Sequence, residues 1–292
     1  MRIGFLGFGE AARAFCDSLV PQAIGFTAYD ILLGEEAGAE AMRAAMLERN
    51  VTIAETPAGL RDADWIVSAV TADQSLIAAR SLLPHLVQGQ VLVDLNSVSP
   101  RRKRETASEV EAAGAVYLDM AVMAPVHPHG HRTPVLLAGE EVDRLAEEMA
   151  GLGFNGRVVG DRPGAATAVK MVRSLFVKGL EAITVEALLA AEASGCFDEI
   201  LASLSTSYPG LDLPKMAPYQ FERTLRHGAR RAAEMRESAA TLDALGLRGG
   251  LAAETAEIQQ RMGVAGKAVN PDEPSLRELV RTVLAARLAE AG

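Results

Sequence analysis

The chain has 292 residues, of which 49% are hydrophobic and 23% charged, a composition typical of globular proteins. This length allows two domains with a core each. The formal net charge of -9 argues against a general attraction to nucleic acid or to an anionic membrane surface. No apolar run is long enough to span a membrane. A phosphate group, if one is bound, must therefore be held by local geometry.

The number and spacing of the cysteines indicate the cellular compartment. Cys16 and Cys196 are the two cysteines of the sequence, and their spacing matches neither a metal site nor a disulfide framework. Both lie in apolar helical contexts, which favours buried thiols. We expect a protein of the reducing cytoplasm.

The first twelve residues carry the clearest motif. Residues 3–6 predict a buried strand, residues 7–12 have the pattern Gly-x-Gly-x-x-Ala, and residues 11–20 predict a helix. Gly7 permits a tight turn, and Gly9 lets the backbone approach a pyrophosphate.

This order of strand, glycine turn and helix is typical of dinucleotide-binding folds. Ala12 allows close packing of helix and strand, and the helix N-terminus attracts phosphate. The predicted cofactor contacts from the turn are Gly7, Phe8, Gly9, Glu10 and Ala11.

The second predicted strand, residues 23–29, ends at an acid. Asp30 lies about 20 residues beyond the glycine turn, where a carboxylate accepts from the adenosine ribose 2′-hydroxyl and repels a 2′-phosphate. This favours NAD over NADP as the cofactor. Asp30 as a solvated turn acid, and Arg43 as a phosphate ligand, are the open alternatives.

The pattern up to residue 159 predicts a mainly parallel sheet. Its strands are expected at residues 51–53, 64–70, 90–94, 115–123, 133–138 and 155–159, with helices at 35–49, 74–83, 101–113 and 139–150. Ligands of such sheets bind beyond the carboxyl ends of the strands. By that position, Val70, Thr71, Asn96 and Ser97 are candidate cofactor neighbours.

Residues 161–164, Asp-Arg-Pro-Gly, indicate a domain boundary. We expect a dinucleotide-binding, Rossmann-like doubly wound α/β domain at residues 1–162 and an all-helical domain at 163–292. The helices of the second domain are predicted at residues 165–193, 197–207, 218–245, 251–262 and 274–289.

Three histidines, His127, His129 and His131, alternate in one loop. Alternation would place the three rings on one side of an extended loop, as a metal site requires. No cysteine or carboxylate is interleaved, however, and two prolines and a glycine indicate an irregular loop. Solvated or substrate-facing histidines are therefore favoured over a metal site.

The helix predicted at residues 165–193 is mostly apolar and should be buried on most sides. A narrow polar stripe nevertheless follows it at three- and four-residue spacing, formed by Thr167, Lys170, Ser174, Lys178 and Glu181. A buried stripe needs a partner, which a ligand cleft between the domains would supply. The alternative is a stripe that faces water, with a weak Lys178–Glu181 surface pair.

Lysine can serve as acid or base when an alcohol and a carbonyl are interconverted. Near neutral pH this requires a pKa lowered from about 10.4 to roughly 7–8, which apolar surroundings and a neighbouring cation favour. Lys170, two helical turns from Lys178, has both conditions available.

Three motifs resemble those of the β-hydroxyacid dehydrogenases, relatives of 6-phosphogluconate and 3-hydroxyisobutyrate dehydrogenases. Gly-Phe-Gly-Glu-Ala-Ala at residues 7–12 is similar to the family's cofactor motif, and Asp-Leu-Asn-Ser-Val-Ser-Pro at 94–100 to its segment beside the nicotinamide. Gly-Ala-Ala-Thr-Ala-Val-Lys-Met at 164–171 resembles the catalytic-lysine motif, which implies that Lys170 is the general acid/base. The family usually has asparagine where this chain has Ser174.

Two departures limit what the resemblance implies. The family's substrate loop usually reads Asp-Ala-Pro-Val-Ser-Gly-Gly, whereas residues 119–125 read Asp-Met-Ala-Val-Met-Ala-Pro. Every residue of this loop except Pro125 has a backbone N–H group, so the loop could still bind an anion. Residues 225–247 resemble a little-characterised subgroup of phosphogluconate-dehydrogenase-like proteins.

The hypothesis is an NAD(P)-dependent oxidoreductase acting on a small, β-hydroxyacid-like substrate. Substrate contacts are expected from Met123, Ala124, Pro125, Ser174 and Lys178, with His127, His129 or Arg231 as further anion ligands. The family likeness also implies a homodimer. An imine or other carbonyl reductase, and a non-catalytic dinucleotide sensor, are the alternatives.

Overall fold

The computed structural model describes residues 1–19 and 24–291. The chain divides into two compact units, Met1–Lys170 and Met171–Gly292. This division falls within a helix, whereas the sequence places the domain boundary after residue 162, and that placement stays a prediction. The predicted end of the first helix at residue 20 and the start of the second strand at residue 23 lie outside the described residues.

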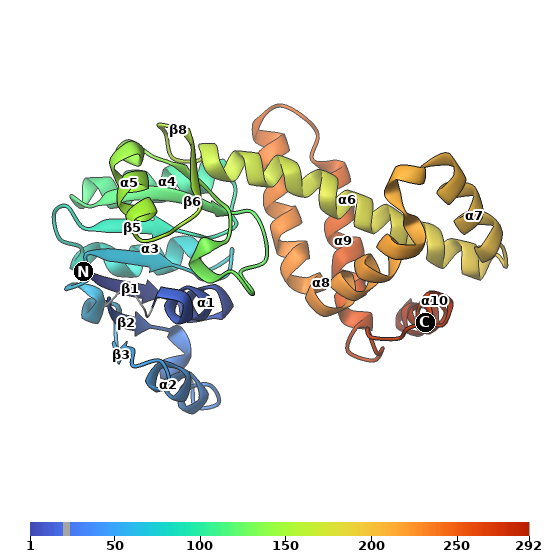
Figure 1. The fold of residues 1–292 in the computed structure, drawn as a ribbon, viewed down its shortest axis with the longest axis horizontal. Helices are drawn as coiled ribbons and strands as arrows, with labels where there is room; N and C mark the ends of the chain where they lie inside the picture. Colours follow the sequence, from blue (N-terminus) through green and yellow to red (C-terminus); the bar gives the residue numbers. More distant parts are fainter. Residues whose placement is uncertain (20–23, 292) are drawn as a thin grey trace. The chain divides into compact units, whose positions relative to one another are not determined.

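In the described part of the first unit, eight strands form one sheet in the order β3-β2-β1-β4-β5-β6-β7-β8 (Figure 1). Strands β1 to β6 are parallel, β7 is antiparallel to β6, and β8 is parallel to β7. The strands are β1 (Arg2–Leu6), β2 (Gly25–Tyr29), β3 (Thr52–Ile53), β4 (Trp65–Ser68), β5 (Val91–Asp94), β6 (Val116–Val122), β7 (Val135–Ala138) and β8 (Gly156–Gly160). The expected Rossmann-like, mainly parallel sheet is confirmed.

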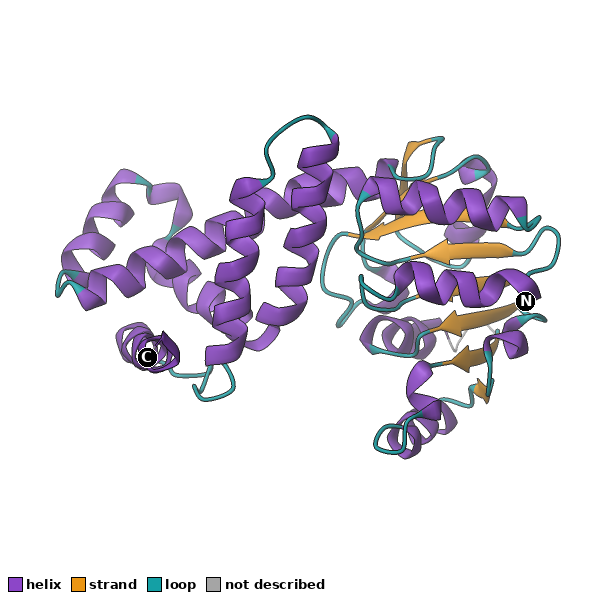
Figure 2. Cartoon of the chain, turned by 180° about the vertical axis from the view of Figure 1, so that it is seen from behind, coloured by secondary structure: helices purple, strands orange, loops and turns teal. Residues whose placement is uncertain are grey.

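Helices cover both faces of this sheet (Figure 2). They are α1 (Glu10–Leu19), α2 (Ala39–Leu47), α3 (Ser75–Leu82), α4 (Pro100–Ala112) and α5 (Val142–Gly151), with short 3₁₀ helices η2 (Ile31–Gly34), η3 (Pro57–Leu60), η4 (Leu83–His85) and η5 (Gly130–Arg132). Successive side chains of a strand point to opposite faces. Accordingly, Val91 and Val93 belong to the core under α1, α2 and α5, and Leu92 to the core under α3 and α4. Burial on both faces explains the near-continuous apolar runs.

The sheet reverses its winding between β1 and β4. The chain adds β2 and β3 on one side of β1 and then returns to place β4 on the other side. Gly7 lies at this point with φ +87°, and a Cβ there would lie 2.7 Å from the Ala69 carbonyl oxygen. Only glycine fits without strain. Doubly wound sheets bind their ligands at this switch point, outside the carboxyl ends of the strands.

The second unit is helical throughout its described residues, as predicted. Its helices are the remainder of α6 (Ala165–Ala193), then α7 (Phe197–Ser207), η6 (Pro209–Leu211), α8 (Leu213–Ala244), α9 (Gly250–Ala265) and α10 (Leu276–Ala291). Leu188, Phe221, Met262 and Val280 are buried in its core. Helices α8 and α9 pack closely because Gly228 has no side chain, and a Cβ there would overlap the Gln259 carbonyl oxygen. Within the described ranges, no helix is long and apolar enough to cross a membrane.

The predicted start of α8 was wrong. The predicted range of this helix, residues 218–245, begins at Pro218. The helix instead begins at Leu213 and keeps Pro218 inside it. Leu213 and Ala217 are buried, so packing of this first turn compensates for the hydrogen bond that proline cannot donate.

The expected burial of α6 on most sides was also wrong. Val172, Phe176 and Ile183 are 54%, 72% and 61% exposed, and they recur at four- and seven-residue spacing. These side chains share one side of the helix. The helix therefore buries its polar stripe and leaves an apolar side uncovered in the single chain.

Candidate functional site

The glycine turn has room for a phosphate group. Gly7 N–H donates to the Tyr29 carbonyl at 2.8 Å, and the first helical bond of α1 runs from Arg13 N to the Gly9 carbonyl at 3.0 Å. A Cβ at Gly9 would meet no protein atom within 4 Å. The chain's own packing therefore does not require glycine at this position. The missing side chain leaves space at a helix N-terminus, which fits the pyrophosphate of a dinucleotide.

Asp30 holds the glycine turn from the end of β2. Its Oδ2 accepts from Phe8 N at 2.7 Å and its Oδ1 from Leu32 N at 3.0 Å. The residue is 9% exposed, so the description as a solvated turn acid is wrong. A carboxylate oxygen has two lone pairs, and each oxygen of Asp30 keeps one for a ribose hydroxyl.

Arg43 is paired with an acidic side chain. Both of its terminal nitrogens donate to Glu55, each at 2.6 Å. The pair is exposed and bidentate, the geometry that arginine and carboxylate favour.

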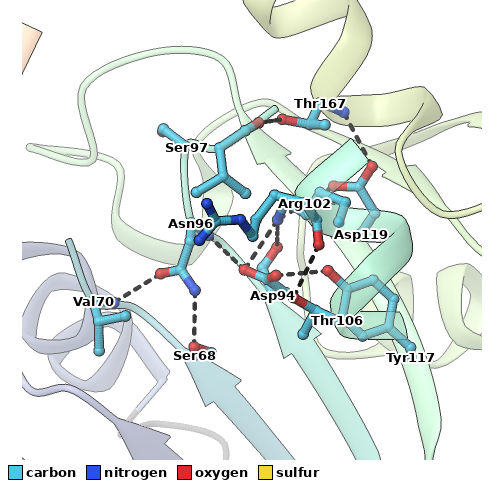
Figure 3. A network of polar contacts seen from close by, with 12 residues as sticks. Ser68, Val70, Asp94, Asn96, Ser97, Arg102, Thr106, Tyr117, Asp119 and Thr167 are labelled. Atoms are coloured by element: carbon cyan, nitrogen blue, oxygen red, sulfur yellow. Dashed lines mark hydrogen bonds and ion pairs between the residues drawn. The ribbon is translucent and has the colours of Figure 1, made fainter. Parts of the chain in front are cut away.

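Asn96 ties together the ends of β4 and β5. Its Oδ1 accepts from Val70 N at 2.8 Å, and its Nδ2 donates to Ser68 Oγ at 2.9 Å (Figure 3). The Asn96 side chain is buried, whereas Thr71 is exposed. Of the residues predicted at these strand ends, Asn96 thus fixes the backbone and Ser97 carries the side chain that meets a catalytic candidate.

That candidate is Lys170, in the second turn of α6. Its Nζ donates to Ser97 Oγ at 2.6 Å, and the lysine is half-buried. The start of α6 is held by Asp119, whose Oδ2 accepts from Gly164 N at 3.0 Å and Thr167 N at 3.1 Å. The structure therefore brings together two residues that the sequence singled out separately.

A buried cluster of charges lies next to these residues, and the sequence analysis missed it. The ammonium of Lys103, on α4, lies 3.0 Å from Asp94 Oδ1 and 3.4 Å from Asp119 Oδ1. Tyr117 donates to Asp94 Oδ2 at 2.6 Å (Figure 3). Burial raises the pKa of Asp119, which the Lys103 ammonium opposes. Burial and Asp94 raise the pKa of Tyr117 well above its ordinary value.

One sequence signal could have found this cluster. The buried residues of α4 are Lys103, Thr106, Ala107 and Val110, at the spacing of a core-facing helix side. A lysine at a core-facing position needs a buried acidic partner.

The polar stripe of α6 continues as buried pairs in the second unit. Lys178 Nζ lies 2.6 Å from Glu234 Oε2 and donates to Ser174 Oγ at 3.2 Å, and Glu181 is paired with Arg231. All five residues lie largely out of solvent, so the water-facing alternative with a Lys178–Glu181 surface pair is wrong. Burial lowers the pKa of Lys178, although Glu234 opposes that shift.

Of the stretch considered for anion binding, residues 119–122 belong to β6, and only Met123, Ala124 and Pro125 follow the strand. Met123 N–H donates to the Pro134 carbonyl at 2.9 Å. Ala124 and Pro125 are exposed. The Met123 amide is therefore already bonded within the protein, and the expectation that it could bind an anion is wrong.

The three loop histidines do not share a side. His127 and His129 are exposed, whereas His131 is buried against Phe154, with its Nδ1 2.8 Å from Ser18 Oγ. Burial lowers the pKa of His131. Among residues 1–19 and 24–291, no group of three or more histidines, cysteines or carboxylates could hold a metal ion.

The cysteines are both free thiols. Cys16 is buried, which raises the pKa of its thiol to about 11, and Cys196 is half-buried.

Two family models match the chain. The NAD binding domain of 6-phosphogluconate dehydrogenase matches residues 2–145, and a domain of unknown function (DUF1932) matches residues 191–262. The first match covers the glycine turn, Asp30 and the ends of β4 and β5. An NAD(P)-binding domain is therefore present.

Solved structures and curated relatives agree with these matches. A conserved hypothetical protein from Sinorhizobium meliloti 1021 is 35% identical, with a TM-score of 0.76 over 99% of this chain and 96% of that one. Mycobacterium tuberculosis 3-hydroxyisobutyrate dehydrogenase shares the fold at 17% identity, with a TM-score of 0.70 over 97% of this chain and 98% of that one. Mitochondrial 3-hydroxyisobutyrate dehydrogenase of Bos taurus is 24% identical over 209 residues, 69% of this chain and 60% of the relative. The match thus spans about 60% of that relative's length. The chain belongs to the β-hydroxyacid dehydrogenase family.

Proposed function

We propose that this protein is an NAD(P)-dependent oxidoreductase that interconverts a hydroxyl and a carbonyl group on a small, β-hydroxyacid-like substrate. The observation that carries the proposal is the 2.6 Å contact of Lys170 Nζ with Ser97 Oγ. Ser97 follows β5, at the edge of the sheet where doubly wound folds bind their ligands. A side chain that can transfer a proton therefore lies at the edge where folds of this class bind their ligands.

The proposed mechanism uses Lys170 as general acid/base. A bound nicotinamide supplies the hydride acceptor or donor. In oxidation, the lone pair of neutral Lys170 Nζ takes the proton of the substrate hydroxyl while the carbon loses hydride. In reduction, the Lys170 ammonium returns that proton to the carbonyl oxygen. Ser97, which accepts from Nζ, orients the lysine between these steps.

Substrate contacts are proposed for Met123, Ala124, Pro125, Ser174 and Lys178. Ser174 lies four residues beyond Lys170 on α6, on the same side of the helix. Lys178 already has a carboxylate partner in Glu234, so a substrate anion must compete with that carboxylate for it.

NAD is the proposed cofactor, in preference to NADP. Two contacts support this choice. The carboxylate of Asp30 lies at the end of β2 beside the glycine turn, where it would repel a 2′-phosphate. Arg43 is engaged by Glu55.

A homodimer and a cytoplasmic location also stay predictions. The exposed apolar side of α6 at Val172, Phe176 and Ile183 supports the dimer, because such patches mark interaction sites. Light scattering coupled to size exclusion checks it.

The decisive experiment titrates the protein with NADH and NADPH by cofactor fluorescence, and then assays a panel of hydroxy acids and alcohols. Lys170→Ala should keep cofactor binding and lose about 10²–10⁴-fold in kcat, the usual contribution of a general acid/base. Arg173→Ala is the matched control, because it removes an exposed cation from the same helix.

Binding of neither cofactor contradicts the proposal, and so does full turnover by Lys170→Ala. Activity with cyclic imines and none with hydroxy acids indicates an imine reductase instead. Cofactor binding with no turnover on any substrate indicates a dinucleotide sensor.

A further inference from the structure

We propose that Lys103 is a positioning residue for this site: its buried ammonium joins the turn that carries Ser97 to the first turn of the helix that carries Lys170. The inference rests on the proposed function, because positioning matters for catalysis only if Lys170 transfers the proton.

Lys103 contacts two acids that lie side by side in the sheet. Asp94 and Asp119 are paired in register on the parallel strands β5 and β6. The Lys103 side chain has no solvent exposure, and its Nζ reaches the carboxylates of Asp94 at 3.0 Å and Asp119 at 3.4 Å. Nζ also donates to the Asp94 carbonyl at 2.7 Å. Two neighbouring buried carboxylates repel each other unless a cation lies between them.

The first carboxylate fixes the turn after β5. Asp94 Oδ1 accepts from Asn96 N at 2.8 Å, and its Oδ2 accepts from Tyr117. The Asn96 side chain in turn holds Val70 N and Ser68 Oγ. Ser97 is the next residue, so its position depends on Asp94.

The second carboxylate fixes the start of α6. Asp119 Oδ2 accepts from Gly164 N and Thr167 N, which are among the amides that a helix start leaves without a helical partner. Thr167 Oγ1 also donates to the Val98 carbonyl at 2.8 Å. Lys170 lies less than one turn further along the helix.

One ammonium therefore links both halves of the Lys170–Ser97 contact. Lys103 does not touch that contact and acts through Asp94 and Asp119. Removing its charge leaves two facing carboxylates, which would move apart or take up a proton. Either change alters the backbone at the turn, at the helix start, or at both. A displacement of about 1 Å in a catalytic group can reduce the rate by about 100-fold.

The test replaces Lys103 by methionine, which has similar length and no charge. In Lys103→Met we expect kcat to fall about 10–100-fold, with cofactor affinity within about threefold of the wild type. Amide hydrogen exchange should accelerate in residues 94–98 and 164–170. Val110→Ala is the matched control, because it destabilises the same helix at another buried position. It should leave kcat and the exchange of both segments unchanged.

A pH profile separates positioning from simple charge balance. While both carboxylates stay ionised, the Lys103→Met cluster carries one more negative charge than the wild type, which favours protonated Lys170, so kcat/KM for oxidation should rise at higher pH than in the wild type. The double variant Lys103→Met/Asp119→Asn has the wild-type net charge without the ionic link. It should restore the profile and keep kcat at least tenfold low. It also carries the test if Lys103→Met does not fold.

Two outcomes overturn the inference. Full recovery of kcat in the double variant means that Lys103 only balances charge. Unchanged hydrogen exchange in both segments of Lys103→Met means that the ammonium holds neither the turn after β5 nor the start of α6. The exchange result needs no substrate, so it tests Lys103 even if Lys170→Ala refutes the proposed function.

Discussion

Each unit buries a cluster of charges, but the two clusters hold different parts of the chain. In the first unit, Asp94 and Asp119 accept from the backbone amides of Asn96, Gly164 and Thr167. In the second unit, the buried charges bond from side chain to side chain between α6 and α8.

The difference lies in what each cluster can determine. A carboxylate that accepts from amides fixes the path of the backbone, and no apolar side chain can replace it without leaving those amides unpaired. An ion pair between two helices can be replaced by apolar side chains of similar volume at little cost. We therefore expect the first cluster to be irreplaceable and the second to be replaceable as a pair.

The largest expected effect comes from Asp119→Ala. It leaves two buried amides and part of the Lys103 charge without an acceptor, and breaking a buried charge pair costs about 3–5 kcal/mol of unfolding free energy. Asp119→Asn keeps an acceptor oxygen and should cost less than half as much. Urea denaturation measures both variants. Asp62→Ala, at an exposed acid, is the control. A loss below about 1 kcal/mol for Asp119→Ala would show that water or the backbone replaces the carboxylate.

The parts of this arrangement that could be predicted from the sequence are local in the chain. The glycine turn lies within twelve residues, and its strand, turn and helix follow each other directly. The bounds of α6 matched the predicted residues 165–193, because its apolar and polar residues keep one period over 29 residues. The lysine motif and the Asn-Ser turn were each visible as short patterns.

The contacts that join these patterns could not be predicted, because they depend on strand pairing and helix packing. Lys103 meets Asp119 because β5 and β6 are neighbours. Lys178 meets Glu234 across 56 residues of sequence. The prediction of solvated or substrate-facing loop histidines was wrong for His131 for a related reason: η5 turns the chain and buries that side chain, so alternation in sequence is not alternation in space.

A double-mutant cycle on Glu181 and Arg231 tests the second half of the comparison. Glu181→Leu or Arg231→Met alone leaves one buried charge unpaired and should cost about 3 kcal/mol. The double variant should lose about 1 kcal/mol of unfolding free energy, because only the Gln259 amide, which donates to Glu181 in the wild type, is left without a hydrogen-bond acceptor. Urea denaturation gives the three values. If the single effects simply add in the double variant, the pair is as irreplaceable as the first cluster.

The smallest expected effect is a dependence of stability on pH that comes from Lys178. It shows whether burial or the attraction of Glu234 has the larger effect on the pKa of Lys178. Burial lowers the folded-state pKa of Lys178 from its ordinary 10.5; Glu234 opposes this shift, and Arg231 and Arg230 add to it. Between the lowered value and 10.5, the folded state binds fewer protons than the unfolded state. The contribution of Lys178 to stability therefore rises with pH across that window and is lowest below it.

We expect the difference in unfolding free energy, wild type minus Lys178→Met, to grow as the pH rises towards 10.5. Urea denaturation at steps of half a pH unit from pH 7 upwards measures it. Lys215→Met, at an exposed lysine of α8, measures the effect of losing one positive charge and is subtracted. A difference that shrinks with pH would mean that Glu234 outweighs burial and that the folded state holds the Lys178 proton more tightly. The Lys178–Glu234 pair would then stabilise the folded state, and the second cluster would no longer be the replaceable one.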